Sequence, residues 1–202
     1  MTRKPYSSAA RAAAADRTRG EIVAAAARLL REPAGAEPFS LEGVGKQAGV
    51  SRLTVYNHFG SRRALLEAVF DNIAERSGLT RLGEAAGDAD ARRGLSRLVA
   101  TFCDFWAAEA GAHGRIQAAR ADDAELDAAL EARNQRRKRL LHVILGRLIG
   151  DDRAAARDDL IDSLYVLTSQ PVFAGLARER GEADARRLIE AMASDAVRRA
   201  GV

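Results

Sequence analysis

The chain has 202 residues, 47% of them hydrophobic and 30% charged, and a formal net charge of +4. This length can bury a core in one large domain or two small ones. No run of about 18 apolar residues occurs, so we expect no membrane span. Arg11 and Asp16 interrupt the N-terminal alanines, which argues against a signal peptide. Cys103 is the single cysteine, which excludes an internal disulfide framework and is consistent with a cytoplasmic protein.

The positive charge is concentrated at the N-terminal end. Residues 1–63 contain 11 Lys and Arg against 5 Asp and Glu, a net of +6, whereas the remainder has a net of −2. A basic end of this kind attracts phosphate and gives salt-dependent binding. A codon bias toward arginine is the alternative, but such a bias should not select one end of the chain.

Strong helix formers dominate the sequence, with 5% aromatic residues and 4 prolines, so we predict an all-α fold. Residues 1–17 lack an apolar stripe, and we expect a flexible basic arm that either lies along DNA or is solvated. The first helix is predicted to begin at Thr18, because Thr18 and Glu21 match a capping box, and to end near Arg31.

Three serines precede short segments with helical patterns. Ser40, Ser51 and Ser61 are favoured N-caps, because a serine hydroxyl accepts a hydrogen bond from a free amide of the first helical turn. They predict helices over 41–48 and 52–59, and a third helix that begins at Ser61.

Gly49 and Val50 leave only a tight turn between the first two of these helices, which must therefore cross steeply. Helix, tight turn and second helix form the helix-turn-helix pattern, whose second helix enters a DNA groove. We therefore predict a helix-turn-helix DNA-binding domain over 18–60, a linking helix over 61–78 and a C-terminal domain over 79–202.

The outer face of the 52–59 helix has an unusual composition. Val55 and Phe59 are expected to be its buried pair, which leaves a leucine and a tyrosine exposed among polar donors. No acidic residue lies between Glu42 and Glu67, which suits a surface that contacts a polyanion.

Residues 50–66 read Val-Ser-Arg-Leu-Thr-Val-Tyr-Asn-His-Phe-Gly-Ser-Arg-Arg-Ala-Leu-Leu. This segment resembles the signature of the TetR family of bacterial transcriptional regulators, and the resemblance extends over roughly residues 18–75. It implies a three-helix DNA-binding domain, a fourth linking helix and an all-α ligand-binding and dimerisation domain, about nine helices in total. It also implies a repressor that a small molecule releases.

Physical roles can be assigned to the reading helix. Arg52 has the reach and geometry to bond guanine or phosphate. Leu53 and the Thr54 methyl group are suited to packing on a thymine methyl group. The resemblance implies contacts with the DNA backbone for Tyr56, His58 and Arg62. The alternative is that Tyr56 and His58 pack the small domain. The expected DNA-binding residues are Ser40, Lys46, Ser51, Arg52, Leu53, Thr54, Tyr56, Asn57, His58 and Arg62.

The C-terminal part is predicted to be helical after a loop or a frayed connection over 79–90. The helix over 154–177 should be kinked by Pro171 and is apolar nearly all round, so one side is expected to meet a second copy. The other predicted helices cover 91–110, 123–149 and 182–200. The expected dimer contacts are Leu160, Leu164, Val172, Leu176, Leu188 and Met192.

An effector pocket is expected among the three central helices, lined by Phe102, Cys103, Trp106, His142, Tyr165 and Thr168. Core packing explains these residues equally well. Few charges lie among them, which favours a hydrophobic or aromatic effector. The basic run over 136–139 is interpreted as a solvated helix face rather than a nucleic-acid patch.

No catalytic motif or metal-ligand spacing occurs, so we expect no enzyme activity, metal or cofactor. The sequence favours a homodimeric repressor of a palindromic operator that a small effector releases. The alternative is an effector-independent structural DNA-binding or protein-interaction factor with a solid helical dimer core.

Overall fold

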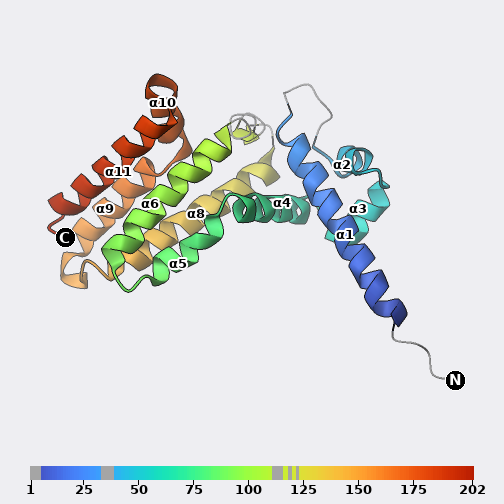
Figure 1. Cartoon of the computed structure of the whole chain (residues 1–202), viewed down its shortest axis with the longest axis horizontal. Coiled ribbons are helices and arrows are strands. Elements are labelled where there is room, and N and C mark those ends of the chain that lie inside the picture. The colour runs from blue at the N-terminus through green and yellow to red at the C-terminus, as the bar shows by residue number, and fades with distance from the viewer. Residues whose placement is uncertain (1–5, 33–38, 111–115, 118–119, 122) are drawn as a thin grey trace. The chain divides into compact units, whose positions relative to one another are not determined.

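The computed structural model describes residues 6–32, 39–110, 116–117, 120–121 and 123–202. Within these ranges every regular element is a helix (Figure 1), which confirms the all-α prediction. The α-helices are α1 (Tyr6–Leu29), α2 (Leu41–Ala48), α3 (Arg52–Phe59), α4 (Arg62–Arg76), α5 (Leu82–Gly87), α6 (Ala91–Ala108), α8 (Ala124–Gly146), α9 (Ala154–Leu167), α10 (Gln170–Arg180) and α11 (Glu182–Arg199). Two short 3-10 helices, η1 and η2, cover Leu79–Arg81 and Asp151–Arg153.

The chain forms two compact units. The N-terminal unit comprises residues 1–73 and 114–129, and the C-terminal unit comprises residues 74–113 and 130–202. The division falls inside α4 and inside α8, so each of these helices contributes residues to both units.

Helix α1 begins at Tyr6, well before the predicted start at Thr18. The stretch ahead of Thr18 is rich in alanine, the residue with the highest intrinsic helix propensity, and this outweighs the local capping pattern. Its described side chains are exposed up to Arg17, whereas the following turns bury Ile22 and Leu29. The part of the predicted basic arm that the structure describes is therefore helical, and α1 packs against α2 through its second half.

Helices α2 and α3 have the bounds that the serine caps predict. Ser40 Oγ accepts from Gly43 N at 3.0 Å, and Ser51 Oγ accepts from Thr54 N at 3.0 Å. Gly49 follows α2 with φ = 70°, a left-handed conformation that glycine adopts without strain. These local interactions define the tight turn between the two helices.

Gly45 allows the close approach of α2 to that turn. A Cβ atom at this position would lie 2.9 Å from the carbonyl oxygen of Val50, which is closer than a side chain tolerates. The amide of Val50 in turn donates to the Gly45 carbonyl at 2.9 Å. The helix-turn-helix crossing thus depends on the absence of a side chain at residue 45.

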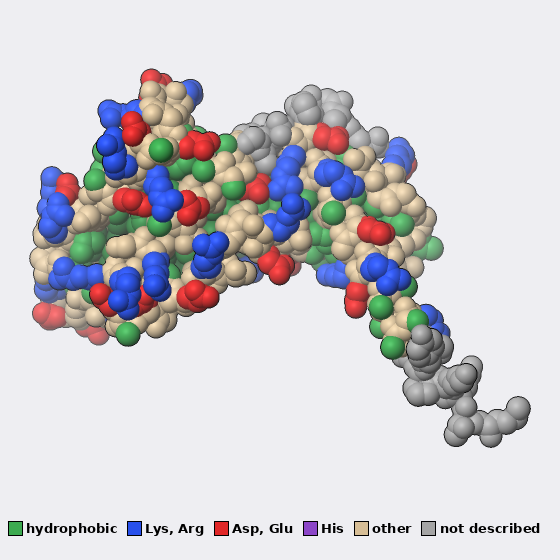
Figure 2. Space-filling view, viewed as in Figure 1, with side chains coloured by type: hydrophobic (Ala, Val, Ile, Leu, Met, Phe, Trp, Pro, Cys, Tyr) green, Lys and Arg blue, Asp and Glu red, His purple; other side chains and the backbone are tan. Residues whose placement is uncertain are grey.

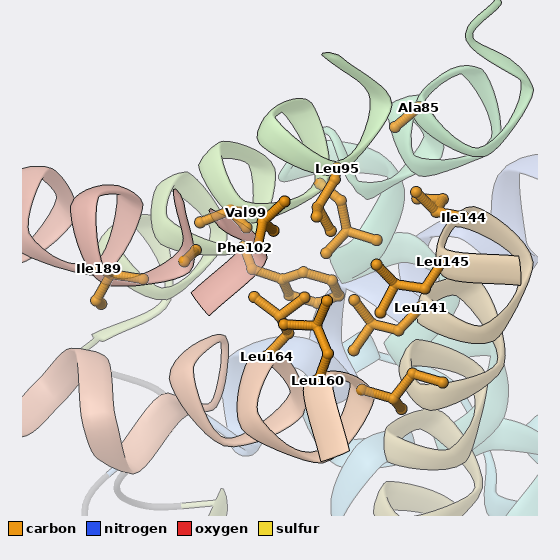
Figure 3. Packing of buried hydrophobic residues seen from close by; sticks show 14 of the residues in the cluster. Ala85, Leu95, Val99, Phe102, Leu141, Ile144, Leu145, Leu160, Leu164 and Ile189 are labelled. Atoms are coloured by element: carbon orange, nitrogen blue, oxygen red, sulfur yellow. The ribbon is translucent and has the colours of Figure 1, made fainter. Parts of the chain in front are cut away.

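The C-terminal unit is built around one apolar cluster to which α6, α8, α9 and α11 contribute (Figure 3). Each helix places its buried side chains at helical spacing, so the cluster follows from amphipathic stripes in the sequence. Figure 3 shows these side chains converging between the helices; the labelled ones include Leu95, Val99, Phe102, Leu141, Ile144, Leu145, Leu160, Leu164 and Ile189.

Two expectations about this unit are wrong. Residues 79–90 are not a loop, because η1 and α5 form there and Leu82 and Ala85 are buried against the cluster. The helix expected over 154–177 is two helices, α9 and α10, which are separated at Thr168 and Ser169. Pro171 lies in the first turn of α10, where its missing N–H costs no hydrogen bond, and so begins a helix instead of kinking one.

Asp88 organises the connection between α5 and α6. Its buried carboxylate accepts from Arg93 Nη2 at 2.6 Å and lies 2.9 Å from Arg97 Nη1, while its carbonyl accepts from Arg147 Nη2 at 2.7 Å. The hydrogen bond from Arg93 lowers the pKa of Asp88 to about 2. Asp88 therefore joins the start of α6, through its carboxylate, to the residue that follows α8, through its carbonyl.

No single helix among the described residues is long and apolar enough to cross a membrane. The segments Asp151–Leu167 and Gln170–Arg180 meet the length and composition test only as a pair, and they are bent by 50° where they join.

Candidate nucleic-acid interface

Helix α3 exposes apolar side chains on the face that the sequence predicts to read DNA. Leu53 is 66% exposed and Tyr56 is 53% exposed, and Arg52 and Asn57 are also exposed beside them. Val55 and Phe59 are buried on the opposite side, as predicted. Water is a poor environment for a leucine and a tyrosine side by side, so this face is suited to a contact surface.

The hydroxyl groups near the helix starts are already engaged. Ser51 Oγ lies 2.9 Å from Thr54 Oγ1 and also caps the helix, so both side chains hold α3 in shape. Ser40 caps α2 in the same way. Lys46 is exposed and lies 3.7 Å from the carboxylate of Glu42, one helical turn away. Ser40 and Ser51 thus fix the N-termini of α2 and α3, and a helix N-terminus is a favourable position for a phosphate.

Arg19 of α1 positions α3, a role that the sequence did not indicate. Its guanidinium lies 4.3 Å from the centre of the Phe59 ring, and its Nη1 donates to the His58 carbonyl at 2.8 Å. His58 itself is half-buried. The interaction joins residues 39 positions apart, so no local pattern could have pointed to Arg19.

Arg62, which is predicted to contact the DNA backbone, has protein partners in the structure. Its guanidinium bonds the carboxylates of Asp123 and Glu125, with Nη1 2.9 Å from Asp123 Oδ1 and 3.1 Å from Glu125 Oε2. Its Nε donates to the Phe39 carbonyl at 3.1 Å. The hydrogen bond between Arg62 and Asp123 raises the pKa of the first and lowers that of the second. In this structure Arg62 is held by acidic partners within the N-terminal unit.

Four of the six expected effector-pocket residues lie together in the C-terminal unit. Phe102, Cys103, Trp106 and Thr168 are buried, and Trp106 Nε1 donates to the Thr168 carbonyl at 2.9 Å. Burial raises the pKa of the Cys103 thiol to about 11, so this cysteine is a packed, unreactive side chain. Tyr165 is half-buried beside the same cluster.

His142 does not belong to this group, because it is exposed on α8. Leu141, Ile144 and Leu145 take the buried face of that helix, and His142 lies about 100° around the helix from Leu141. The sequence pattern placed His142 near the apolar stripe without deciding on which side of it the ring would fall.

Arg137 corrects the interpretation of the basic run as a wholly solvated face. Arg136 and Arg139 are exposed as expected, but Arg137 is only 6% exposed. Its guanidinium lies 4.3 Å from the centre of the Tyr165 ring, and its Nη1 donates to the Thr168 carbonyl at 2.9 Å. A buried arginine thus adjoins the expected pocket residues.

The residues expected at a dimer interface fall into two groups. Leu160 and Leu164 are buried inside the protomer's own cluster, at 4% and 0% exposure, because α9 turns this side inward. Met192 is 44% exposed, and three others are half-buried on α10 and α11, namely Val172, Leu176 and Leu188.

A pocket of about 490 Å³ lies between α6 and α11. Its apolar floor includes Leu95 and Val99, and its rim includes Arg92 and Arg198. None of the expected effector residues lines it. Figure 2 shows basic and acidic side chains intermingled over this part of the surface. Among the described residues, no group of His, Cys, Asp and Glu side chains could hold a metal ion.

The fold and the reading helix together define a helix-turn-helix protein whose DNA-binding element is its N-terminal unit. Residues 22–69 match the sequence profile of the bacterial regulatory proteins of the tetR family. These residues therefore form a DNA-binding domain of the tetR family, which makes the protein a DNA-binding transcriptional regulator.

Comparison with solved structures agrees on the fold. The chain is similar to the crystal structure of a protein from Rhodococcus sp. that is assigned to the TetR-family transcriptional regulators, with a TM-score of 0.64 and 19% sequence identity. The match covers 90% of this chain and 99% of the other. No curated protein matches the sequence.

Proposed function

We propose that this protein is a homodimeric repressor that leaves a palindromic operator when a small molecule binds in its C-terminal unit. The observation that carries the proposal is the outer face of α3. Leu53 and Tyr56 are exposed there beside Arg52, and no acidic residue occurs from residue 43 to residue 66. An apolar and cationic helix face without acidic side chains is suited to the major groove of DNA.

The contacts divide by chemistry. Arg52 has the donor geometry for guanine O6 and N7, and the exposed Leu53 has the apolar surface for a thymine methyl group. Tyr56 and Asn57 supply polar atoms for phosphates or base edges. The capped N-termini of α2 and α3 would meet the DNA backbone, so the serines act through the helix ends that they stabilise.

The proposed dimer rests on apolar side chains that α10 and α11 leave accessible. Val172 and Leu176 are one turn apart on α10, Leu188 and Met192 are one turn apart on α11, and the two helices pack against each other. Two such helices from each protomer would form a four-helix bundle, which spaces two reading helices for the two halves of a palindrome.

The proposed effector site rests on the polar groups inside the C-terminal core. Trp106, Arg137 and Thr168 bring hydrogen-bonding atoms together among aromatic side chains. Small-molecule sites combine mostly apolar walls with a few fixed polar groups, and this cluster has that composition.

The test is binding to the DNA beside the protein's own gene. A labelled fragment of that region should give an anisotropy increase that weakens as salt is raised. Leu53→Ser should weaken binding, while Val143→Ser, which changes another exposed apolar side chain (53% exposed) on α8, should leave it unchanged. Salt-insensitive binding, or equal effects of the two variants, would contradict the proposed reading surface.

The effector-independent alternative gives a different result with the same fragment. A structural DNA-binding factor would hold its DNA in the presence of every small molecule tried, whereas a ligand-controlled repressor is released by its effector. The oligomeric state follows from sedimentation of the full chain, and Met192→Glu together with Leu188→Glu should shift a dimer toward monomers.

A further inference from the structure

We propose that the effector is an organic acid on an aromatic or similarly flat apolar skeleton, and that Arg137 binds its carboxylate. This inference rests on the effector control proposed above, and it adds the chemical class of the ligand. It also narrows the sequence-based expectation of a hydrophobic or aromatic effector by adding an acidic group.

The first argument is that the Arg137 guanidinium is buried without a carboxylate in ion-pair contact, since Glu131 acts on it only as a more distant charge. The residue is 6% exposed, and no carboxylate in the described part of the chain lies within 4.0 Å of its nitrogens. Its Nε is buried and has no hydrogen-bond partner there. Burial lowers the pKa of Arg137, but a guanidinium stays protonated in proteins, so the positive charge remains. Burying a cation of this kind destabilises the fold unless an anion pairs with it.

The second argument is that the hydrogen-bond partners of Arg137, which are the Thr168 carbonyl and the Tyr165 side chain, do not account for its burial. Nη1 donates to the Thr168 carbonyl at the end of α9, which would be a reasonable helix cap. However, that carbonyl already accepts from Trp106 Nε1 at 2.9 Å, so the helix end is satisfied without an arginine. A cap would also leave the buried Nε unused.

The third argument is the geometry of the edge that carries the unpaired Nε. Nη1 donates to the Thr168 carbonyl, whereas Nε has no hydrogen-bond partner among the described residues and shares the opposite edge of the planar group with Nη2. Two parallel N–H donors of this kind match the two oxygens of a carboxylate. A lysine or a neutral donor at this position would not offer the same bidentate edge.

The surroundings specify the rest of the ligand. The Arg137 guanidinium lies 4.3 Å from the centre of the Tyr165 ring and 5.5 Å from that of Phe102, and Phe102 stacks on Trp106 with ring centres 6.3 Å apart. Aromatic side chains around one cation favour a flat apolar body with a single acidic group. This cluster therefore selects aromatic carboxylates over sugars, amines or neutral hydrocarbons.

The first test measures stability in the absence of ligand. Arg137→Met removes the charge and keeps the volume, so the free protein should melt at the same temperature as the wild type or a few degrees higher. Arg139→Met, on the same helix but exposed, is the matched control and should change little. A clearly lower melting temperature for Arg137→Met alone would make Arg137 a structural residue and overturn the proposal.

The second test uses benzoate, phenylacetate and 2-naphthoate, each beside its uncharged carboxamide. Trp106 is the single tryptophan and shares the Thr168 carbonyl with Arg137, so its fluorescence reports binding directly. At about 100 times its Kd a bound acid should raise the melting temperature of the wild type by roughly 5–10 °C. The carboxamides, and every acid with Arg137→Met, should have little effect. If no acid exceeds its amide, the proposal is wrong.

Operator binding separates this proposal from the function on which it rests. If the wild type binds no DNA beside its gene, the proposed function fails whatever the acids do. If it binds DNA and the amides release it as well as the acids do, effector control stands and the acid-binding role of Arg137 fails. Release by acids alone, lost in Arg137→Met and kept in Arg139→Met, is the expected result.

Discussion

The guanidinium of Arg62 is bonded to the carboxylate of Asp123 across 61 residues of sequence. Arg62 is the first residue of α4 and follows the reading helix after a short turn, and Asp123 directly precedes α8. The same guanidinium bonds the carbonyl of Phe39, which adjoins the Ser40 cap of α2. One side chain therefore fastens three segments of the N-terminal unit to one another.

Asp123→Asn should weaken this junction, because it removes one of the two carboxylates that hold Arg62. We expect the free energy of unfolding to fall by about 1 kcal/mol, the scale for a partly exposed ion pair, and the melting temperature to fall by roughly 2–4 °C. Thermal unfolding followed by circular dichroism measures the change. Asp159→Asn removes the same charge from an exposed position and should have no such effect. Equal melting temperatures for both variants would show that the Arg62 bond adds no net stability.

Asp88→Asn should destabilise the C-terminal unit in a manner that depends on pH. The pKa of Asp88 is about 2 in the fold and about 3.9 in an unfolded chain, so the ionised form favours folding. That contribution is complete above pH of about 4 and is lost as the pH falls toward about 2. Melting temperatures of both proteins over a pH series should therefore differ most near neutrality and converge in acid. A gap that stays constant down to pH of about 3 would contradict this role.

Arg52→Ala should reduce operator affinity by about 1–3 kcal/mol if its guanidinium bonds a guanine. The loss should be confined to the base pair that Arg52 reads, which competition with operators substituted at single positions will show. Arg178→Ala, which removes an exposed arginine from α10, is the control for charge. A loss that is the same for every sequence would assign Arg52 to a phosphate instead.

Gly45→Ala should destabilise the helix-turn-helix crossing, because the new methyl group would meet the Val50 carbonyl at 2.9 Å. Overpacking of this kind costs about 1–3 kcal/mol, and operator binding should weaken with it. Gly20→Ala is the matched control: its methyl group meets nothing within 4 Å in the middle of α1, and it should stabilise the protein by about 0.5–1 kcal/mol. A neutral Gly45→Ala would show that the turn can move aside.

The bounds of α2 and α3 were predictable because they depend on local chemistry. A serine hydroxyl bonds an amide three residues later, and Gly49 accepts the left-handed conformation that closes the helix. The outer face of α3 was predictable for a similar reason, since Val55 and Phe59 fix which side of a short helix is buried.

The sequence-based predictions failed where two local signals competed, and where a side chain depends on partners far away in the sequence. At Thr18 a capping pattern competed with the helix propensity of the preceding alanines, and propensity prevailed. The partners of Arg62 and the burial of Arg137 depend on residues 61 and 31 positions away, which no periodicity encodes. Four adjacent basic residues look alike in sequence, and only the packing of α8 against its neighbours distinguishes Arg137 from the rest.

The carbonyl of Thr168 receives donors from two other helices, Trp106 on α6 and Arg137 on α8. Because this acceptor belongs to the main chain, mutation of the Thr168 codon cannot delete it, and only the two donors are open to loss by substitution. Evolution can therefore retune what this junction recognises by exchanging Arg137 or Trp106, while the break between α9 and α10 keeps presenting the same oxygen to whatever replaces them.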